Sequence, residues 1–356
     1  MTTVAAEMPH RDPARDRALV RWWLLSVALL VVAMVLVGGG TRLTDSGLSI
    51  TEWKPIHGVI PPLNEAEWQE EFARYQQIPE YQVINKGMSL EAFKGIFWWE
   101  WAHRFLGRFI GVVFLLPLIF FAATGRIERR LVPQLAVVFV LGGLQGAIGW
   151  WMVASGLVER TDVSQYRLAI HLTFACVILA YLVWIAVGLR PVRDAAPPGL
   201  RRLQVVILAV VFVQIFAGGL VAGLDAGLVT REWPLINGAL IPSGLLHMAP
   251  AWLNLFENAL TVHFDHRLVA YLLLALVAWQ AVRTGGTPYA RGARSLLVIV
   301  VAQACIGIAT VMAGVPLWLA LLHQLGAVAV LAHAVINLRR MVPTGNAPAA
   351  ALEMSR

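Results

Sequence analysis

WWEWAHRFLGR, residues 98–108, opens an apolar run that continues as FIGVVFLLPLIFFAA to residue 123. A helix of this length and composition can cross a bilayer, which takes about 20 predominantly apolar residues. The run nevertheless carries Glu100, His103, Arg104 and Arg108. Ionisable groups at membrane depth are costly and usually mark a functional site. In a helix, Glu100 and His103 lie one turn apart on the same face, so we expect the two side chains to act together.

The composition extends this reading to the whole chain. Its 356 residues are 58% hydrophobic and only 14% charged, which is too apolar for a soluble protein. Both cysteines lie inside apolar runs, so no loop offers a redox pair. The sequence predicts an all-α polytopic membrane protein. Eight spanning helices are expected at residues 20–40, 96–123, 132–154, 167–189, 203–223, 261–283, 294–314 and 319–339.

The distribution of charge predicts the orientation of the chain. The short connections 124–131, 190–202 and 284–293 are basic, as are both tails. Lysine and arginine collect on the cytoplasmic side of membrane proteins, so both termini are expected there. Residues 1–19 form a cytoplasmic N-terminal tail in this reading, and residues 340–356 form a disordered one. Orientation accounts for the net charge of +7, so no nucleic-acid partner is invoked.

Two long outer connections, residues 41–95 and 224–260, are expected to be functional, since long loops in compact proteins usually are. Residues 65–77 have helical spacing with Trp68 and Phe72 on one side. This pattern predicts a helix lying on the membrane surface.

The two halves of the sequence repeat each other. An offset of 180 residues relates Gly38–Gly39 to Gly218–Gly219, and it also relates the pairs that follow: Asp45 and Asp225, Glu52–Trp53 and Glu232–Trp233. Later matches are His103–Arg104 with His266–Arg267, Gln145 with Gln303, and His171 with His323. Four helices per repeat preserve orientation, so this is a parallel repeat. We expect two pseudo-symmetric four-helix bundles, residues 20–189 and 203–339.

Histidines cluster at one depth of the predicted bundles. Five of the nine lie near the outer ends of even-numbered helices: His103, His171, His263, His266 and His323. Each half thus carries one repeated histidine on each of two helices. Two facing imidazoles suit a bis-histidine haem, whereas iron–sulfur clusters need thiolates and zinc needs more ligands. Four of these histidines are therefore predicted axial ligands (His103, His171, His266 and His323), with Arg104 and Arg267 neutralising the propionates.

Structural readings remain open beside these chemical ones. An intramembrane histidine can simply bond neighbouring helices, and the arginines can snorkel to water. Gly142–Gly143, Gly146 and Gly149 are interpreted as close helix packing. Aligning His103 with His266 puts Glu100 opposite His263, so the first half is the catalytic candidate. Glu100 would shuttle protons or bind a polar intermediate there, with an ion pair to Arg104 as the alternative.

The chain resembles the haem A synthase family. The matching stretches are GGGTRLTDSGLSITEWKPIHGVIPP at residues 38–62, the WWEWAHRFLGR run, the Gln145–Gly149 and His171 regions, and DHRLVAY with His323. The likeness spans roughly residues 20–340. The lack of cysteines in the first loop resembles the proteobacterial and mitochondrial branch.

This resemblance implies an oxidoreductase that acts on haem O. The methyl group at ring position 8 would become a formyl group by two successive hydroxylations and loss of water, giving haem A for cytochrome oxidase. By analogy, His103 and His171 flank the substrate with Glu100 catalytic, and His266 and His323 ligate a haem b cofactor. Expected partners are haem O synthase, the cytochrome oxidase assembly route, membrane lipid and an unidentified electron donor, in a bacterial inner membrane.

Two other functions use the same features. A dihaem b-type electron-transfer protein linked to quinone would need the same four histidines and perform no chemistry on haem. A transporter with parallel repeats would carry no stoichiometric pigment. The carboxylate present in only one half, together with the long repeated outer loop, favours the synthase.

Overall fold

The computed structural model describes residues 12–54, 57–190 and 195–343. Regular structure in these ranges is helical, apart from an isolated bridge between Ile236 and Ala239. The predicted tail beyond residue 343 and the first eleven residues lie outside the described part.

Eight helices in the described part are long and apolar enough to cross a membrane, which confirms the predicted all-α polytopic class. They are α1 (Pro13–Leu43), α4 (Leu90–Ala123), α5 (Val132–Val153), α6 (Gln165–Gly188), α7 (Pro198–Gly223), α9 (Ala259–Arg283), α10 (Ala290–Met312) and α11 (Leu317–Arg340). Shorter helices occupy the connections: α2 (Glu65–Tyr75), α3 (Pro79–Val83), α8 (Asn254–Glu257), and the 3-10 turns η1 (His57–Val59), η2 (Arg129–Leu131), η3 (Ala226–Leu228) and η4 (Ala251–Leu253).

Several helices begin earlier than predicted. Helix α1 starts at Pro13, where the Asp12 side chain caps it by accepting a hydrogen bond from the Ala14 amide at 2.9 Å. Residues 13–19 are therefore helical, and the first helix begins before the predicted residue 20. Helix α4 likewise starts at Leu90, capped by Ser89. Helical hydrogen bonding continues through polar turns that a hydropathy pattern leaves out.

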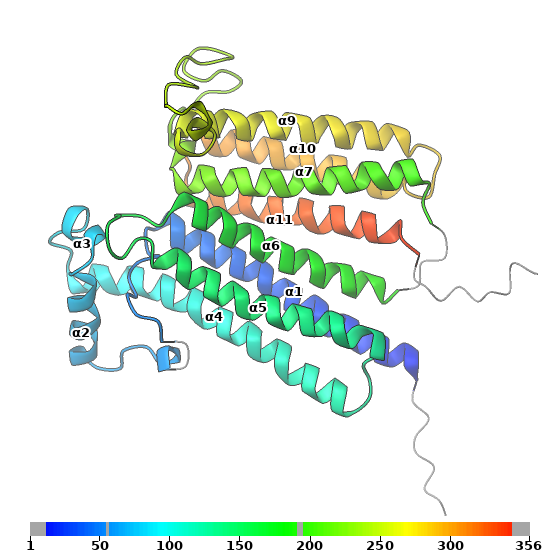
Figure 1. The fold of residues 1–356 in the computed structure, drawn as a ribbon, viewed down its shortest axis with the longest axis horizontal. Coiled ribbons are helices and arrows are strands. Elements are labelled where there is room, and N and C mark those ends of the chain that lie inside the picture. Colours follow the sequence, from blue (N-terminus) through cyan, green and yellow to red (C-terminus); the bar gives the residue numbers. More distant parts are fainter. Residues whose placement is uncertain (1–11, 55–56, 191–194, 344–356) are drawn as a thin grey trace, which may run out of the picture.

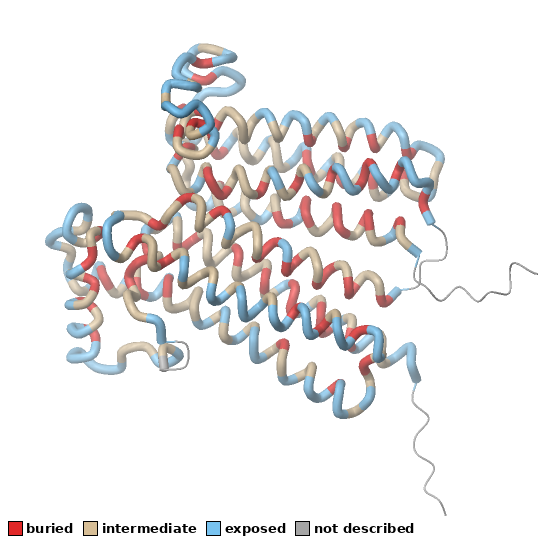
Figure 2. Tube along the Cα trace, viewed as in Figure 1, coloured by how far each residue is buried: buried red, intermediate tan, exposed pale blue. Residues whose placement is uncertain are grey.

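The first four spanning helices lie in one half of the molecule and the last four in the other (Figure 1). Helix α6 is the most buried span, and it packs against α1, α5, α7 and α11. Leu24, Leu182, Ile207 and Leu331 belong to the continuous core between the halves. The outward sides of the helices remain exposed (Figure 2), and on α4 and α5 they present apolar side chains such as Leu116 and Val140 to the surroundings.

A small aromatic cluster forms at the N-terminal end of α4. Trp68 and Phe72 on α2 contact Phe97 and Phe93, with ring centroids 4.9 and 5.1 Å apart. The helix predicted at 65–77 is confirmed as α2, although its apolar side packs on α4 instead of on lipid. The first outer loop is thereby fixed to the helix that carries Glu100 and His103.

Candidate functional site: two histidine pairs and their arginine clamps

The four repeated histidines form two pairs, one in each half. His103 on α4 faces His171 on α6, with ring centroids 6.5 Å apart and an angle of 68° between the rings. His266 on α9 faces His323 on α11 at the same 6.5 Å and at 71°. The sequence prediction that these side chains meet in pairs is confirmed in both halves.

Each ring of the two pairs lies against a glycine on a neighbouring helix. A Cβ atom added to Gly149 would come within 2.9 Å of the His171 ring, and one added to Gly307 within 2.7 Å of the His323 ring. At Gly38 and Gly218 the distances are 3.0 Å to His103 and 3.3 Å to His266. All four distances are shorter than ordinary van der Waals contact, and two of them are below 3.0 Å, so these glycines give the imidazoles their room.

This finding corrects the interpretation of the glycines on α5. A Cβ atom at Gly142, Gly143 or Gly146 would meet nothing within 4 Å, so these three do not bring helices together. Gly149 does make a close contact, and the group it contacts is the His171 ring.

Glutamines lie beside three of the four rings. The Gln145 amide nitrogen is 3.2 Å from Nδ1 of His171 and donates to that residue's carbonyl oxygen at 3.1 Å. Gln303 makes the same two contacts with His323, at 3.1 and 2.8 Å. The Gln214 amide nitrogen lies 3.2 and 3.1 Å from the two ring nitrogens of His266.

Glu100 is buried in the N-terminal third of α4, with 2% of its surface exposed. Its carboxylate accepts four hydrogen bonds: from the Ser49 hydroxyl and the Ile50 amide, both at 2.7 Å, and from Nε and Nη2 of Arg104 at 3.0 and 2.6 Å. These fill the acceptor positions of a carboxylate. The ion pair with Arg104, which the sequence left as an alternative, is present.

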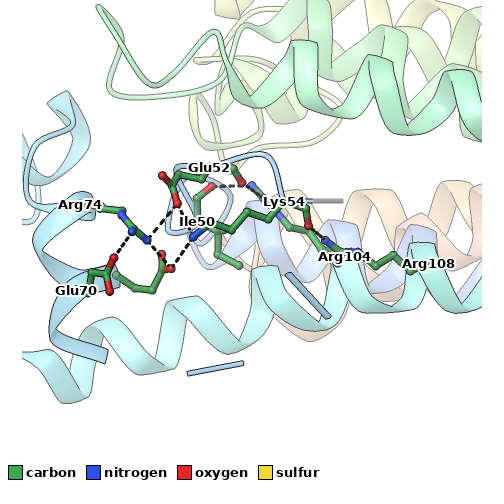
Figure 3. A network of polar contacts seen from close by, with 8 residues as sticks. Ile50, Glu52, Lys54, Glu70, Arg74, Arg104 and Arg108 are labelled. Carbon is green, nitrogen blue, oxygen red and sulfur yellow. Dashed lines mark hydrogen bonds and ion pairs between the residues drawn. The ribbon is translucent and has the colours of Figure 1, made fainter. Parts of the chain in front are cut away.

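Arg104 also clamps the first outer loop to α4. It donates to the carbonyl oxygens of Glu52 at 2.8 Å and Ile50 at 2.6 Å, and Arg108 donates to that of Lys54 at 2.8 Å. Figure 3 shows this row of loop residues between the arginines of α4 and Arg74 on α2. The hydrogen bond from Lys54, with the positive charge of Arg74, lowers the pKa of the Glu52 carboxyl.

The second half repeats the clamp with a different partner. Arg267 donates to the carbonyl oxygen of Glu232 at 2.8 Å, and Glu232 is the residue that the 180-residue offset pairs with Glu52. Its Nε donates to Nε2 of His263 at 2.9 Å, where the first half has Glu100. Nδ1 of His263 lies 2.7 Å from the carbonyl oxygen of Ala226. The side chain one turn before the paired histidine therefore anchors the outer loop in both halves.

A second buried carboxyl lies in the first outer loop, residues 41–95. Glu80 on α3 is 4% exposed, and burial raises the pKa of its carboxyl to about 8, with the negative charges of Asp45, Asp162 and Glu100 adding to the effect. The sequence gave no reason to single it out, because glutamates in polar loops are ordinarily solvated.

The donor set of the two pairs fits haem. Among the described residues, no cluster of three or more His, Cys, Asp or Glu side chains could hold a bare metal ion. Two facing imidazoles leave an iron's remaining four positions to a porphyrin. A metal–imidazole bond measures about 2 Å, and rings with centroids 6.5 Å apart have room for one metal atom between the two imidazoles.

Sequence reasoning missed several groups that surround these residues. Ser49 and the Ile50 amide, which hold Glu100, carry no signal of their own in the sequence. Gln214 was also missed, although it sits one turn before the repeated Gly218 and differs from Met34 at the matching position.

Comparison with known proteins gives a consistent result. The family described as "Cytochrome oxidase assembly protein" (COX15-CtaA) matches residues 21–335. The "Heme A synthase" of Chelativorans sp. (strain BNC1) is 59% identical over 332 residues, covering 91% of each chain. Those of Mesorhizobium japonicum and Sinorhizobium fredii are 56% and 54% identical, and each alignment covers at least 95% of both chains. On this evidence the chain belongs to the COX15-CtaA family of cytochrome oxidase assembly proteins.

Proposed function

We propose that this chain is a haem A synthase, an oxidoreductase that converts the position-8 methyl group of haem O to the formyl group of haem A. The conversion consists of two successive hydroxylations and loss of water. Similarity over nearly the whole length to proteins of that name supports the activity. The observation that carries the proposal is the pair His103–His171 with a buried carboxylate one turn away, a combination that only the first half has.

The first half is the proposed substrate site. His103 and His171 would hold haem O between them, and the exposed apolar sides of α4 and α5 suit a substrate too apolar to leave the bilayer. Glu100 is fixed by Ser49, Ile50 and Arg104, so its carboxylate is presented in one orientation. To receive a proton from an alcohol or a water molecule beside the reacting methyl group, this carboxylate would exchange one of its four hydrogen bonds for one to that group.

The second half is the proposed site of haem b, with His266 and His323 as axial ligands. Bound there, haem b supplies one-electron transfer. The chain's own contribution is to hold the two imidazoles, with Gly218 and Gly307 giving them room and Gln214 and Gln303 bonding to them. His263 stands where the first half has Glu100. Its two ring nitrogens are bonded to Arg267 and to the carbonyl oxygen of Ala226.

Arg104 and Arg267 keep a proposed role at the propionates. Their guanidinium groups are largely occupied by loop carbonyl oxygens. We therefore propose that they act mainly by fixing the outer loops over the haems, with their positive charge attracting the propionates at a distance.

The proposed architecture is two pseudo-symmetric four-helix bundles with both termini in the cytoplasm of a bacterial inner membrane. The symmetry is supported by packing: α1 with α4 corresponds to α7 with α9, and α5 with α6 to α10 with α11. The orientation is supported by the basic connections, which lie at the same end of the helices as the start of α1 and the end of α11 (Figure 1). Haem O synthase is the proposed supplier of substrate, and cytochrome oxidase assembly receives the product.

Extraction and chromatography of the haems bound to purified protein tests this function. We expect haem O or haem A together with haem b. Haem b alone would favour the quinone-linked electron carrier. Protein without bound haem would favour the transporter.

Substitution of the histidines tests the assignment of the halves. His266→Ala should lose haem b and keep the substrate haem, whereas His103→Ala should keep haem b. The reverse pattern would exchange the roles of the two bundles.

A further inference from the structure

Hydrogen-bond support for the four paired histidines is uneven. His171, His323 and His266 each have a glutamine within 3.2 Å of a ring nitrogen. In the described part of the chain, His103 has none. The 180-residue offset that pairs Gly38 with Gly218 places Met34 opposite Gln214, so the missing amide is a difference of one side chain.

Met34 holds the position in the repeat that Gln214 holds in the second half. Its methyl carbon lies 3.2 Å from where a Cβ atom of Gly107 would be, one turn along α4 from His103. Methionine and glutamine have nearly the same length, but a thioether donates no hydrogen bond and accepts one only weakly. The first half therefore has a side chain of similar length at this position, against α4 one turn from His103, without the polar group.

The glutamines are equipped to hold a ligating imidazole. A metal-bound histidine almost always donates its second ring N–H to an oxygen acceptor, which fixes the ring and strengthens the ligand. The side-chain oxygens of Gln145, Gln214 and Gln303 are all buried and have no partner among the described residues. A rotation of the Gln214 amide would bring this free oxygen to the N–H of His266.

The equivalent rings also sit differently on their glycines. The atom of His103 nearest to a Cβ at Gly38 is Nε2, at 3.0 Å, whereas His266 presents Cε1 to Gly218 at 3.3 Å. Histidine rings of the same pairing distance are thus turned differently where Gln214 is replaced by Met34.

We infer that Gln214 is a positioning residue for His266, and that the methionine in its place leaves His103 as the exchangeable ligand of the substrate haem. This inference rests on the proposed function, since it concerns haem held by these histidines. A six-coordinate iron with two fixed histidines has no position for another ligand. An unsupported His103 can withdraw and open one position in the first half only.

Replacing Met34 by Gln, and Gln214 by Met, tests this inference with carbon monoxide as the probe. In dithionite-reduced holoenzyme, the haem of the first half should bind carbon monoxide and haem b should not. The two are followed separately in product-loaded protein, because the formyl group shifts the absorption of haem A. Met34→Gln should slow binding to the first haem by roughly five- to tenfold, the factor expected from one net hydrogen bond.

The matched control is Met34→Leu, which fills the same space without an amide and should leave the binding rate unchanged. The reciprocal variant Gln214→Met should make haem b accessible to carbon monoxide, and it keeps the inference testable if Met34→Gln fails to fold. An unchanged rate in Met34→Gln, or equal slowing in both Met34 variants, would overturn it. Protein without haem in either half would instead refute the proposed function.

Discussion

The two halves hold their histidines in the same way and differ in what stands beside them. Both pairs have ring centroids 6.5 Å apart, and both have an arginine that clamps the outer loop by a matched carbonyl oxygen. The partner of that arginine is the carboxylate of Glu100 in the first half and the imidazole of His263 in the second. Under the proposed function, the shared residues would hold haem, and the exchanged residue would mark the half where chemistry is performed.

Packing of the helices separates the halves as well. Helices α9 and α10 contact each other more extensively than α4 and α5 do. The side of the first bundle formed by α4 and α5 is therefore more loosely packed. This suits the proposed substrate site, which must admit and release an apolar molecule. The haem b proposed for the second half has the opposite requirement, because it would stay bound, and the tighter packing of α9 with α10 suits it.

Replacing Glu100 by Gln is the strongest way to break the comparison. Glutamine keeps the shape of the side chain but removes the charge and the proton acceptor. We expect product formation to fall by about a hundredfold or more, the usual range for loss of a general base, with both haems retained. Undiminished turnover measured by chromatography of haem A would leave the halves chemically equivalent.

Alanine at the glycines beneath the rings should act on each half separately. Gly307→Ala adds a Cβ atom 2.7 Å from the His323 ring and Gly149→Ala adds one 2.9 Å from the His171 ring. Overpacking of this kind costs about 1–3 kcal/mol, so haem retention should fall roughly tenfold in the affected half. Gly142→Ala, which meets nothing within 4 Å, is the control. Equal losses in all three variants would mean that the helices, and not the rings, are disturbed.

The stability of the first outer loop should depend on pH through Glu80. Its carboxyl has a pKa of about 8 in the folded protein, raised mainly by burial. The neutral form is the one that fits, so stability is greatest below the unfolded pKa near 4.5 and is lost as pH rises toward 8 and above. Proteolysis of the first outer loop should accelerate several-fold between about pH 6 and pH 9. Glu80→Gln should remove this dependence, while a variant that kept it would implicate another group.

The smallest expected effect concerns the contact between the halves. Arg42 bonds both Asp45 at 2.9 Å and Asp225 of the other half at 3.0 Å, and the offset pairs Arg42 with Ala222. Both carboxylates are largely exposed, and exposed ion pairs contribute about 1 kcal/mol or less. Asp225→Asn should lower the melting temperature by roughly 1–2 °C at low salt. Asp45→Asn, which leaves the inter-half contact intact, should change it less.

The sequence by itself determined the membrane class, the eight spans, and the pairing of His103 with His171 and of His266 with His323. Hydropathy reports burial along a single helix, and a repeat with a fixed offset carries equivalent side chains to equivalent depths. These signals lie within short stretches or between copies of them. Helix ends were less accurate because capping residues such as Asp12 extend a helix beyond its apolar core.

Only the tertiary structure decided the surroundings of these residues. Glu100 is held by Ser49 and Ile50, about fifty residues away along the chain, and Gly149 turned out to make room for His171. Hydrogen-bond partners and close contacts depend on how separate segments pack, and no local pattern encodes that packing. The run at residues 98–108 thus predicted a functional site. The fold shows that Glu100 and Arg104 bind the first outer loop, and that His103 is the paired histidine with no glutamine beside its ring among the described residues.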